Sequence, residues 1–261
     1  MTSPHCLIAN SLLALALLGG AAPCLAQGSE TLNFVLEPLP PFISDEHGRP
    51  AGPLPDIVNA ACEAIKVTCV FTIMPWRRAY ALAEGGKVDG IFVLVRTPER
   101  EASFYFSEPV MQATYAVFTR QASSLVYTQP QDLDGYTVAA YGPSGTSKVA
   151  EDLAHHAPHM RLEIEVDNVS VLRKLAGGRY GNRGVAVMNR DVGLYLIERD
   201  KVPGLKTVGD IKHNDYAIGL SRKRVAPALV ERFNGAIHEL NRKGTSRLIA
   251  ERYGLRAAGT Q

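Results

Sequence analysis

Two arginines, Arg96 and Arg100, stand just after an apolar strand, where a simple turn would use glycine, asparagine or aspartate. In the stretch DGIFVLVRTPERE, residues 91–95 are apolar and the charged residues follow at once. Thr97 is a good N-cap and Pro98 a good first helical residue, so a helical turn is predicted here. The N–H groups of that turn and a fork-shaped guanidinium form a receptor for a carboxylate. The alternative is a surface turn in which the arginines pair with neighbouring glutamates.

A second stretch, VAAYGPSGTSKVAEDL, combines a strand, a glycine-containing loop and the start of a helix near Ser147. Gly145 allows close approach of the backbone, while Thr146 and Ser147 add hydroxyl groups beside the helix N-terminus. No Gly-Lys-Ser/Thr closes the loop, so a nucleotide-binding P-loop is excluded. The pattern suits a small anion, and an ordinary capped loop is the alternative.

Apolar strands and amphipathic helices alternate along the chain. Strands are predicted at residues 32–36, 67–74, 91–95, 115–119, 137–141, 162–166, 185–188 and 216–220. Helices are predicted from Pro55 onward, at 77–84, from about Ser147, at 169–176 and 192–198, and at the end of the chain. Short apolar strands between helices are typical of parallel sheets covered on both faces. The two runs of this kind, before and after Pro109, predict two α/β lobes. The two arginines stand at the carboxyl end of a strand, where open α/β sheets bind ligands.

Composition narrows the classes of partner. The chain has 28 Lys and Arg against 26 Asp and Glu, with no basic tract, which argues against nucleic acid. His155, His156 and His159 are the only clustered histidines, and their spacing lacks a second group of ligands, so a solvated face is predicted there and no metal site.

The first 26 residues have the pattern of a secretory signal. Residues 12–18 are apolar, and Cys24-Leu25-Ala26 places small residues where a signal peptidase reads them, so cleavage is expected after Ala26. The alternative is lipidation of Cys24, but Pro23 stands before it at a position where a small residue is expected. Two cysteines then remain, Cys62 and Cys69, and one pair in an oxidising compartment predicts one disulfide. No later stretch is long and apolar enough to span a membrane.

The chain resembles the type 2 periplasmic solute-binding proteins of polar amino-acid ABC transporters, also called extracellular solute-binding proteins of family 3. The resemblance covers nearly the whole mature chain. It rests on the order and spacing of LPPFISDEHGRPAGPLPDIVNAA, LAEGGKVDGIFVLVRTPEREASFYFSEPV, QDLDGYTVAAYGPSGTS and FNGAIHELNRKGTSRLIAERYG. The segment NAACEAIKVTCVF also resembles the local disulfide of some members.

This resemblance implies a periplasmic-binding-protein-like type II fold, in which two α/β lobes joined by two crossover segments close on a solute. Lobe 1 would comprise residues 27–113 and 216–261, and lobe 2 residues 114–215. The implied ligand-binding residues are Glu37, Phe42, Trp76, Val95, Thr97, Arg100, Tyr141, Gly145, Thr146, Ser147 and Asn189 or Asp191. Among them, Arg100 would clamp a carboxylate, Trp76 would pack on the solute, and Phe42 would form part of the first-strand wall.

Two positions depart from the family pattern. Val95 stands where many members have a small hydroxylated residue. The aspartate that usually pairs with an α-ammonium falls on Asn189, or on Asp191 if a gap is allowed, so other small carboxylates stay open beside amino acids.

The function implied is a monomeric periplasmic receptor that delivers its solute to a membrane ABC permease, without a cofactor. A second class is an enzyme, because the fold also carries cyclohexadienyl (arogenate) dehydratases, whose chemistry needs a general acid in the cleft. Glu37 and Asp191 are the carboxylates available, and no nucleophile–base pair or cofactor motif accompanies them. A detached sensory module is a third class.

Overall fold

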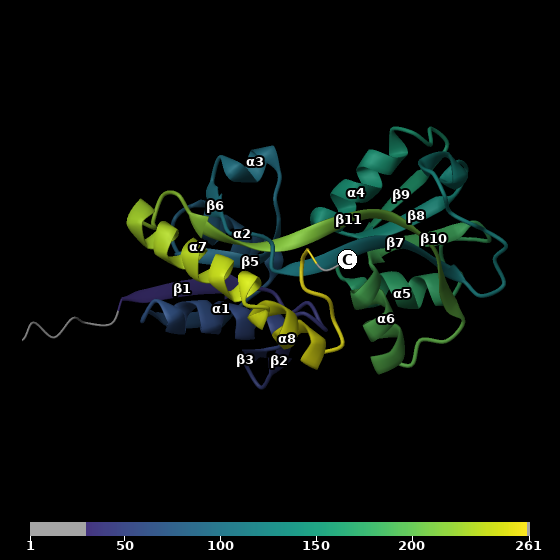
Figure 1. Cartoon of the computed structure of the whole chain (residues 1–261). Helices are drawn as coiled ribbons and strands as arrows, with labels where there is room; N and C mark the ends of the chain where they lie inside the picture. The colour runs from purple at the N-terminus through teal and green to yellow at the C-terminus, as the bar shows by residue number, and fades with distance from the viewer. Residues whose placement is uncertain (1–29, 260–261) are drawn as a thin grey trace, which may run out of the picture.

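Two α/β lobes lie side by side and share one mixed sheet (Figure 1). The computed structural model describes residues 30–259, so the predicted signal peptide lies outside the described residues. Within that range the sheet has 9 strands, in the order β4-β1-β5-β11-β7-β10-β8-β9, with β6 paired to β11 as well. The two-lobed α/β fold predicted from the sequence is therefore confirmed.

The first lobe comes first along the chain. Its elements are β1 (Thr31–Leu36), the hairpin of β2 (Ser44–Glu46) and β3 (Arg49–Ala51), α1 (Pro53–Ala64), β4 (Thr68–Ile73), α2 (Trp76–Glu84), β5 (Gly90–Val95), α3 (Pro98–Glu101) and β6 (Phe104–Phe106). Strand β1 pairs in parallel with both β4 and β5. Helices α7 (Pro227–Arg242) and α8 (Thr245–Arg252), at the end of the chain, pack against α1 and so return to this lobe.

The second lobe is built in the same way, from parallel strands that alternate with helices. Its elements are the 3-10 helix η1 (Pro130–Leu133), β8 (Thr137–Tyr141), α4 (Gly145–Ala154), β9 (Arg161–Glu165), α5 (Asn168–Ala176), β10 (Gly184–Asn189) and α6 (Arg190–Arg199). Strand β8 pairs in parallel with β9 and β10. The inner parallel strands β1, β5, β8 and β10 are largely apolar and buried because helices cover the sheet, whereas the edge strands β4 and β9 consist of exposed and half-buried residues.

Two long strands join the lobes, β7 (Met111–Arg120) and β11 (Leu205–Ser221). They run antiparallel to each other from one lobe to the other (Figure 1). Residues 113 and 114 pair with Asn214 and His213, and Asp215 and Tyr216 pair with residues 112 and 111, so the two predicted lobe boundaries lie within two residues of each other on this ribbon. The sequence predicted only residues 216–220 of β11, because the first part of that strand carries alternating polar residues and lacks an apolar run.

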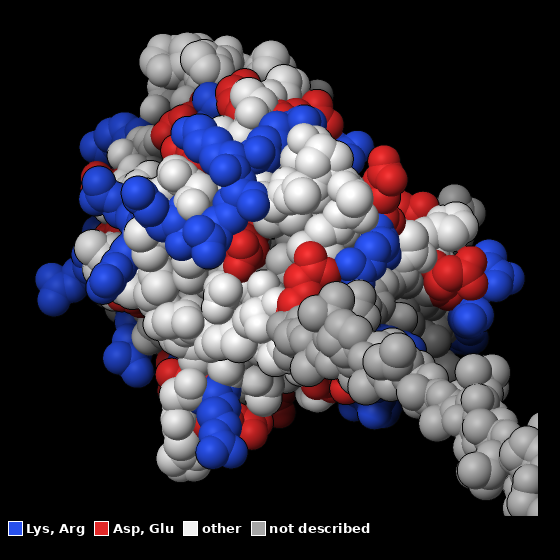
Figure 2. Space-filling view, turned by 90° about the vertical axis from the view of Figure 1, so that its left-hand side faces the viewer, with Lys and Arg blue, Asp and Glu red and all other residues white. Residues whose placement is uncertain are grey.

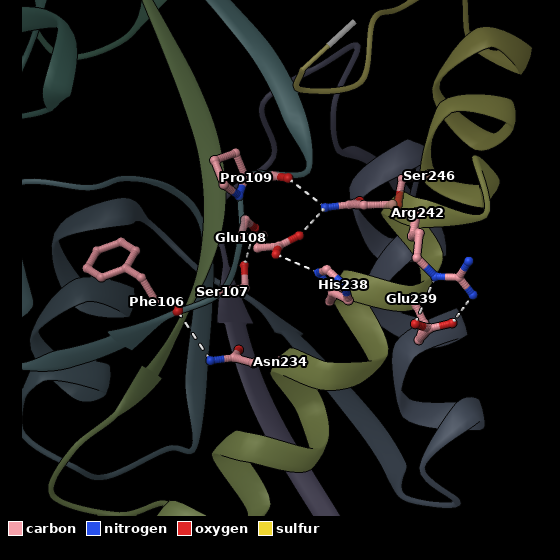
Figure 3. A network of polar contacts seen from close by, with 10 residues as sticks. Phe106, Ser107, Glu108, Pro109, Asn234, His238, Glu239, Arg242 and Ser246 are labelled. Carbon is pink, nitrogen blue, oxygen red and sulfur yellow. Dashed lines mark hydrogen bonds and ion pairs between the residues drawn. The ribbon is translucent and has the colours of Figure 1, made fainter.

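A polar network joins residues 108 and 109, just before β7, to helices α7 and α8 (Figure 3). His238 and Asn241 on α7 bind the Glu108 carboxylate through Nδ1 and Nδ2, at 2.8 and 3.3 Å. The Asn241 amide also donates to the Pro109 carbonyl at 3.1 Å, and Ser246 donates to Asn241 Oδ1 at 2.7 Å. These contacts fix the position from which the crossover strand leaves the first lobe.

Lys and Arg side chains gather on the upper part of the end of the molecule formed by the first lobe, with acidic groups scattered among them (Figure 2). The turn between β11 and α7 lies at this end (Figure 1) and contributes three exposed cations, Arg222, Lys223 and Arg224. Arg222 lies over the Tyr105 ring at 4.1 Å, and Arg224 pairs with the buried Asp89 at 2.9 Å. Two of these three cations are therefore held by contacts with the lobe itself.

Candidate functional site

A cavity lies between the two lobes and takes its walls from both. The open space between these walls is ≈ 600 Å³ and includes some space open to solvent. The first lobe contributes Glu37, Leu39, Trp76, Phe92, Val93, Val95, Arg100 and Tyr216, and the second contributes Tyr115, Tyr141, Ser144, Gly145, Thr146, Asn168, Asn189 and Val192. Eight of the residues predicted from the sequence are brought together here: Glu37, Trp76, Val95, Arg100, Tyr141, Gly145, Thr146 and Asn189.

Arg100 is held in the cavity wall by the strand that precedes it. Its Nη1 donates to the carbonyl of Val95, the last residue of β5, at 2.8 Å. The guanidinium also lies over the Tyr80 ring, 5.7 Å from its centre. Thr97 is the N-cap of α3 and accepts from the Arg100 backbone N–H at 3.4 Å. That N–H is therefore already used, and Thr97 lines a groove next to the cavity and not the cavity itself.

Tyr115 on β7 faces the start of α4 beside Arg100. A Cβ atom on Gly145 would lie 2.9 Å from the Tyr115 hydroxyl oxygen, so only glycine leaves this approach undisturbed. Burial raises the pKa of Tyr115, while the Arg100 charge and a hydrogen bond with Thr146 act in the opposite direction. Tyr115 is thus an O–H group at neutral pH, able to donate to an anion bound at Arg100.

Helix α4 begins two residues earlier than predicted, because Ser144 caps it. The Ser144 hydroxyl accepts from the N–H groups of Thr146 and Ser147, at 3.0 and 3.4 Å. Ser147 returns the contact, accepting from the Ser144 N–H at 3.0 Å. Ser147 was predicted to face the solute, but this reciprocal cap turns its buried hydroxyl away, and it lies outside the cavity wall.

A hydrogen bond crosses the cavity from one lobe to the other. The Tyr141 hydroxyl, at the end of β8, donates to the Glu37 carboxylate, with oxygen–oxygen distances of 3.2 and 3.1 Å. Burial raises the pKa of Glu37, and the bonds from Tyr141 and from the Trp76 backbone N–H only partly oppose this. The same burial, with the Glu37 charge beside it, raises the pKa of Tyr141. A cationic neighbour would therefore stabilise the charged form of Glu37 and lower its raised pKa.

Phe42 and Asp191 were predicted to bind the solute and lie elsewhere. Phe42 is fully buried in the core, where its ring meets the Tyr216 ring edge-on at 5.2 Å, so it supports the wall from behind. Asp191 is half-buried in the first turn of α6 outside the cavity wall, near Arg190 and Arg256.

Apolar groups form the middle of the cavity. Trp76, the first residue of α2, packs on Tyr80 with 5.9 Å between ring centres. Val93 has a φ of 69°, which is uncommon for a β-branched residue, and the pairing of β5 with β11 shifts register at this point. Bulges of this kind re-aim neighbouring side chains beside binding sites. Nothing in the apolar run of residues 91–95 indicated the bulge.

Comparison with known proteins identifies the family. The model of the bacterial extracellular solute-binding proteins, family 3, matches residues 33–256. The chain belongs to this family. A probable amino-acid-binding protein of Bacillus subtilis (strain 168), YxeM, is 25% identical over 217 residues, which is 82% of this chain and 79% of the relative.

Two solved structures show the same fold at lower identity. An ancestral arginine-binding protein bound to arginine is 23% identical, with a TM-score of 0.73, covering 85% of this chain and 97% of the other. A histidine kinase sensor domain with similarity to periplasmic binding proteins is 22% identical, with a TM-score of 0.76, covering 88% and 98%. Binding proteins and sensor domains therefore share this fold.

In this solute-binding protein, Asn189 has its polar atoms engaged. It is 4% exposed, its Oδ1 accepts from the Val192 N–H at 3.1 Å, and its Nδ2 donates to the Tyr216 hydroxyl at 3.2 Å. Asn189 is the N-cap of α6, so the oxygen that was expected to face an amine satisfies the helix instead. The sequence shows an asparagine at this position but does not show that its side-chain oxygen caps α6.

Most of the remaining lining residues were not predicted from the sequence; Leu39 is the exception, because it belongs to the first-strand wall that the family resemblance implies. Tyr115, Val192 and Tyr216 lie in stretches that the sequence predicts as ordinary strand or helix, Asn168 stands just before a predicted helix, and Ser144 lies in the glycine-containing loop predicted to suit a small anion, although it was not named as a ligand. The one available signal was a tyrosine near the predicted boundary on each crossover strand, Tyr115 and Tyr216. Among residues 30–259 there is no group of three His, Cys, Asp or Glu side chains placed to hold a metal ion. No helix within that range has the length and apolar character needed to cross a membrane.

Replacing Glu37 with glutamine should stabilise the protein when no solute is bound. A carboxyl group whose folded pKa is raised destabilises the fold at pH values above its ordinary 4.5, because ionisation is easier in the unfolded chain. Glutamine keeps an acceptor for Tyr141 without the charge. We expect a gain of at most about 1 kcal/mol, or about 2–4 °C in Tm at pH 7. The gain should shrink as the pH is lowered toward 4.5, and a Tm series across this range measures it.

Asp191→Asn is the matched control, because burial also raises the pKa of Asp191 but its side chain lies outside the cavity. Both variants should gain stability at pH 7, and only Glu37→Gln should change solute binding. A lower Tm for Glu37→Gln would mean that the Glu37 charge stabilises the closed cavity.

Proposed function

We propose that the protein is the extracytoplasmic receptor of an ABC-type importer. It captures a small carboxylate-bearing solute, a polar amino acid or a derivative of one, and delivers it to a membrane permease. The observation that carries this proposal is the Arg100 guanidinium, held in the cavity wall by the Val95 carbonyl next to the Tyr115 hydroxyl. A fork-shaped cation beside an O–H donor is the arrangement that recognises a carboxylate.

The remaining parts of the proposal concern the chain as a whole. It is a monomer, secreted by a signal peptide cleaved after Ala26, with lobe 1 formed by residues 27–113 and 216–261 and lobe 2 by residues 114–215. The membership in a family of extracellular solute-binding proteins supports export. The permease meets the closed receptor transiently.

A thermal-shift screen of the secreted protein tests the proposal. The probes are amino acids, their derivatives and small carboxylates. A solute present at 100 times its Kd should stabilise the protein by about 2.7 kcal/mol, or about 5–10 °C in Tm. If no carboxylate shifts the Tm while uncharged solutes do, the proposal is wrong.

A dehydratase on the same fold is the second candidate. Of the two carboxylates available for acid catalysis, only Glu37 lines the cavity, and its raised pKa is the property a general acid needs. A sensory role is the third, and it is compatible with the sensor domain that shares the fold. The dehydratase has no second acidic group in the cavity wall to act with Glu37, and the sensory role rests on the shared fold alone.

We expect no turnover of prephenate or arogenate. A general acid alone lacks the groups that hold a leaving hydroxyl and a developing product, so both substrates should disappear only at the uncatalysed rate. Chromatography of the products over several hours measures this. Dehydration that is lost in Glu37→Gln and retained in Asp191→Asn would establish the enzyme instead.

A further inference from the structure

Two side chains that meet in the cavity wall carry hydrogen atoms without an acceptor. Tyr216 comes from the first lobe and Asn189 from the second, both line the cavity, and Asn189 Nδ2 donates to the Tyr216 hydroxyl oxygen at 3.2 Å. A hydroxyl oxygen that accepts a hydrogen bond still has its own proton to donate. Within residues 30–259 the Tyr216 hydroxyl makes this bond with Asn189 and no other, so its proton is unused.

Helix α6 fixes the orientation of the Asn189 amide. The Oδ1 accepts from the Val192 N–H at 3.1 Å, so the nitrogen is the atom that meets Tyr216. An amide nitrogen has two N–H groups, and one of them remains after the bond to Tyr216. Buried donors without an acceptor are rare in native structures, and both residues are only 4% exposed. The pair therefore calls for an acceptor that the solute supplies.

Tyr216 keeps its proton at neutral pH. Burial raises the pKa of Tyr216 well above its ordinary value of 10, the nearby Tyr115 raises it further, and the bond from Asn189 acts in the opposite direction. Tyr115 is also an O–H group and lies close enough to Arg100 to be affected by its charge. The two crossover strands, β7 and β11, therefore each place a neutral hydroxyl near the cation that binds the carboxylate.

The acceptors around this pair are already used. The Val95 carbonyl, at the end of β5, accepts from Arg100 at 2.8 Å. The Asn189 oxygen caps α6, and this end of the helix carries partial positive charge. An ammonium group next to the bound carboxylate would therefore meet further N–H and O–H donors at this part of the wall.

The one carboxylate among the lining residues, Glu37, lies at the other end of the cavity. One groove leading from the cavity is lined by Glu37 and Tyr141 and contains neither Arg100 nor Tyr115. The second groove is lined by Arg100 and Tyr115 and does not contain Glu37. The Glu37 carboxylate also accepts from the Tyr141 hydroxyl. A group one carbon away from a carboxylate at Arg100 is therefore placed among donors and away from Glu37.

We infer that Tyr216 and Asn189 form a subsite for an oxygen on the carbon next to the carboxylate, so that the preferred solute is a 2-oxo carboxylate. This inference rests on the proposed function, since it takes Arg100 as the site of the carboxylate. A keto oxygen has two lone pairs and no proton, which matches the two unused donors. The apolar residues of the cavity, including Trp76 and Val95, cover the carbon chain.

Calorimetry with four probes of one carbon skeleton tests the inference. Phenylpyruvate, phenyllactate, phenylalanine and 3-phenylpropanoate carry a keto oxygen, a hydroxyl, an ammonium or no polar group on the second carbon, and the matching set built on leucine covers a smaller side chain. In the skeleton that fits best, the keto acid should bind about 10-fold to 100-fold more tightly than the acid without a polar group, because two hydrogen bonds are lost. It should also bind at least about tenfold more tightly than the amino acid.

Variants of the two donors test their part. Tyr216→Phe removes the O–H group at the same shape and should weaken binding of the keto acid about tenfold, while the acid without a polar group binds as before. Asn189→Asp keeps an oxygen to cap α6 but replaces the N–H donor with a negative charge. It should weaken the keto acid and strengthen the amino acid, so that the order of the two probes reverses. A merely structural defect would weaken both. The Tm of each solute-free variant checks that it folds.

The possible outcomes separate the two proposals. If carboxylates bind in an Arg100-dependent way but the amino acid binds more tightly than the keto acid, the inference is overturned and the proposed function stands. Equal binding of the keto acid and the acid without a polar group also overturns it, as does equal weakening of all probes by Tyr216→Phe. If no carboxylate binds, or binding ignores Arg100, the proposed function fails and the inference fails with it.

Discussion

Replacing Arg100 with alanine should weaken solute binding by about 30-fold to several thousand-fold. In a closed cavity the guanidinium–carboxylate pair is desolvated and held by two hydrogen bonds. Removing one partner of such a pair costs about 2–5 kcal/mol, largely because the other charge is left buried and unpaired. Arg100→Lys should not restore binding, since a point charge cannot reproduce the planar fork. Calorimetry with a solute found in the thermal-shift screen measures both variants.

Arg96→Ala is the matched control for this experiment. Arg96 stands one residue past β5, pairs with Glu101 at 3.3 Å and has a side chain that is 58% exposed. It lies over the Phe106 ring, outside the cavity wall. Both alanine variants should keep a near-native Tm without solute. If Arg96→Ala loses binding and Arg100→Ala does not, the carboxylate site has been assigned to the wrong arginine.

Removing the disulfide between Cys62 and Cys69 should lower the free energy of unfolding by about 2.5 kcal/mol. The predicted bond is present and ties α1 to β4, with a Cα–Cα distance of 6.1 Å across a separation of 7 residues. A short loop of this kind restricts the unfolded chain, and its loss lets that chain gain entropy. In a protein of this size the expected decrease in Tm is about 5–10 °C.

The double variant Cys62→Ala, Cys69→Ala measures this change, and chemical reduction of the unaltered protein separates the bond from the lost sulfur atoms. Mass spectrometry of secreted protein under non-reducing conditions should find no free thiol at either position. Two free thiols in the secreted protein would contradict the prediction, as would a Tm that is the same with and without reductant.

Local patterns in the sequence determined the fold. Alternating apolar runs and helical periodicities predicted the parallel strands β1, β5, β8 and β10 and the helices between them, because burial on both faces of a sheet demands apolar residues. The position of Arg100 after a buried strand also followed from sequence, since strand ends meet ligands in this kind of sheet. The two cysteines, close in the chain, required no tertiary information.

Only the tertiary structure decided which polar groups remain for a solute. The Glu37–Tyr141 bond joins residues 104 positions apart, and the cap that occupies the Asn189 oxygen depends on where α6 begins. Phe42 reads as a cavity wall in sequence, but the Tyr216 ring stands in front of it. Such facts depend on packing between distant segments, because a side chain's hydrogen bonds are settled by whichever neighbours the fold brings to it.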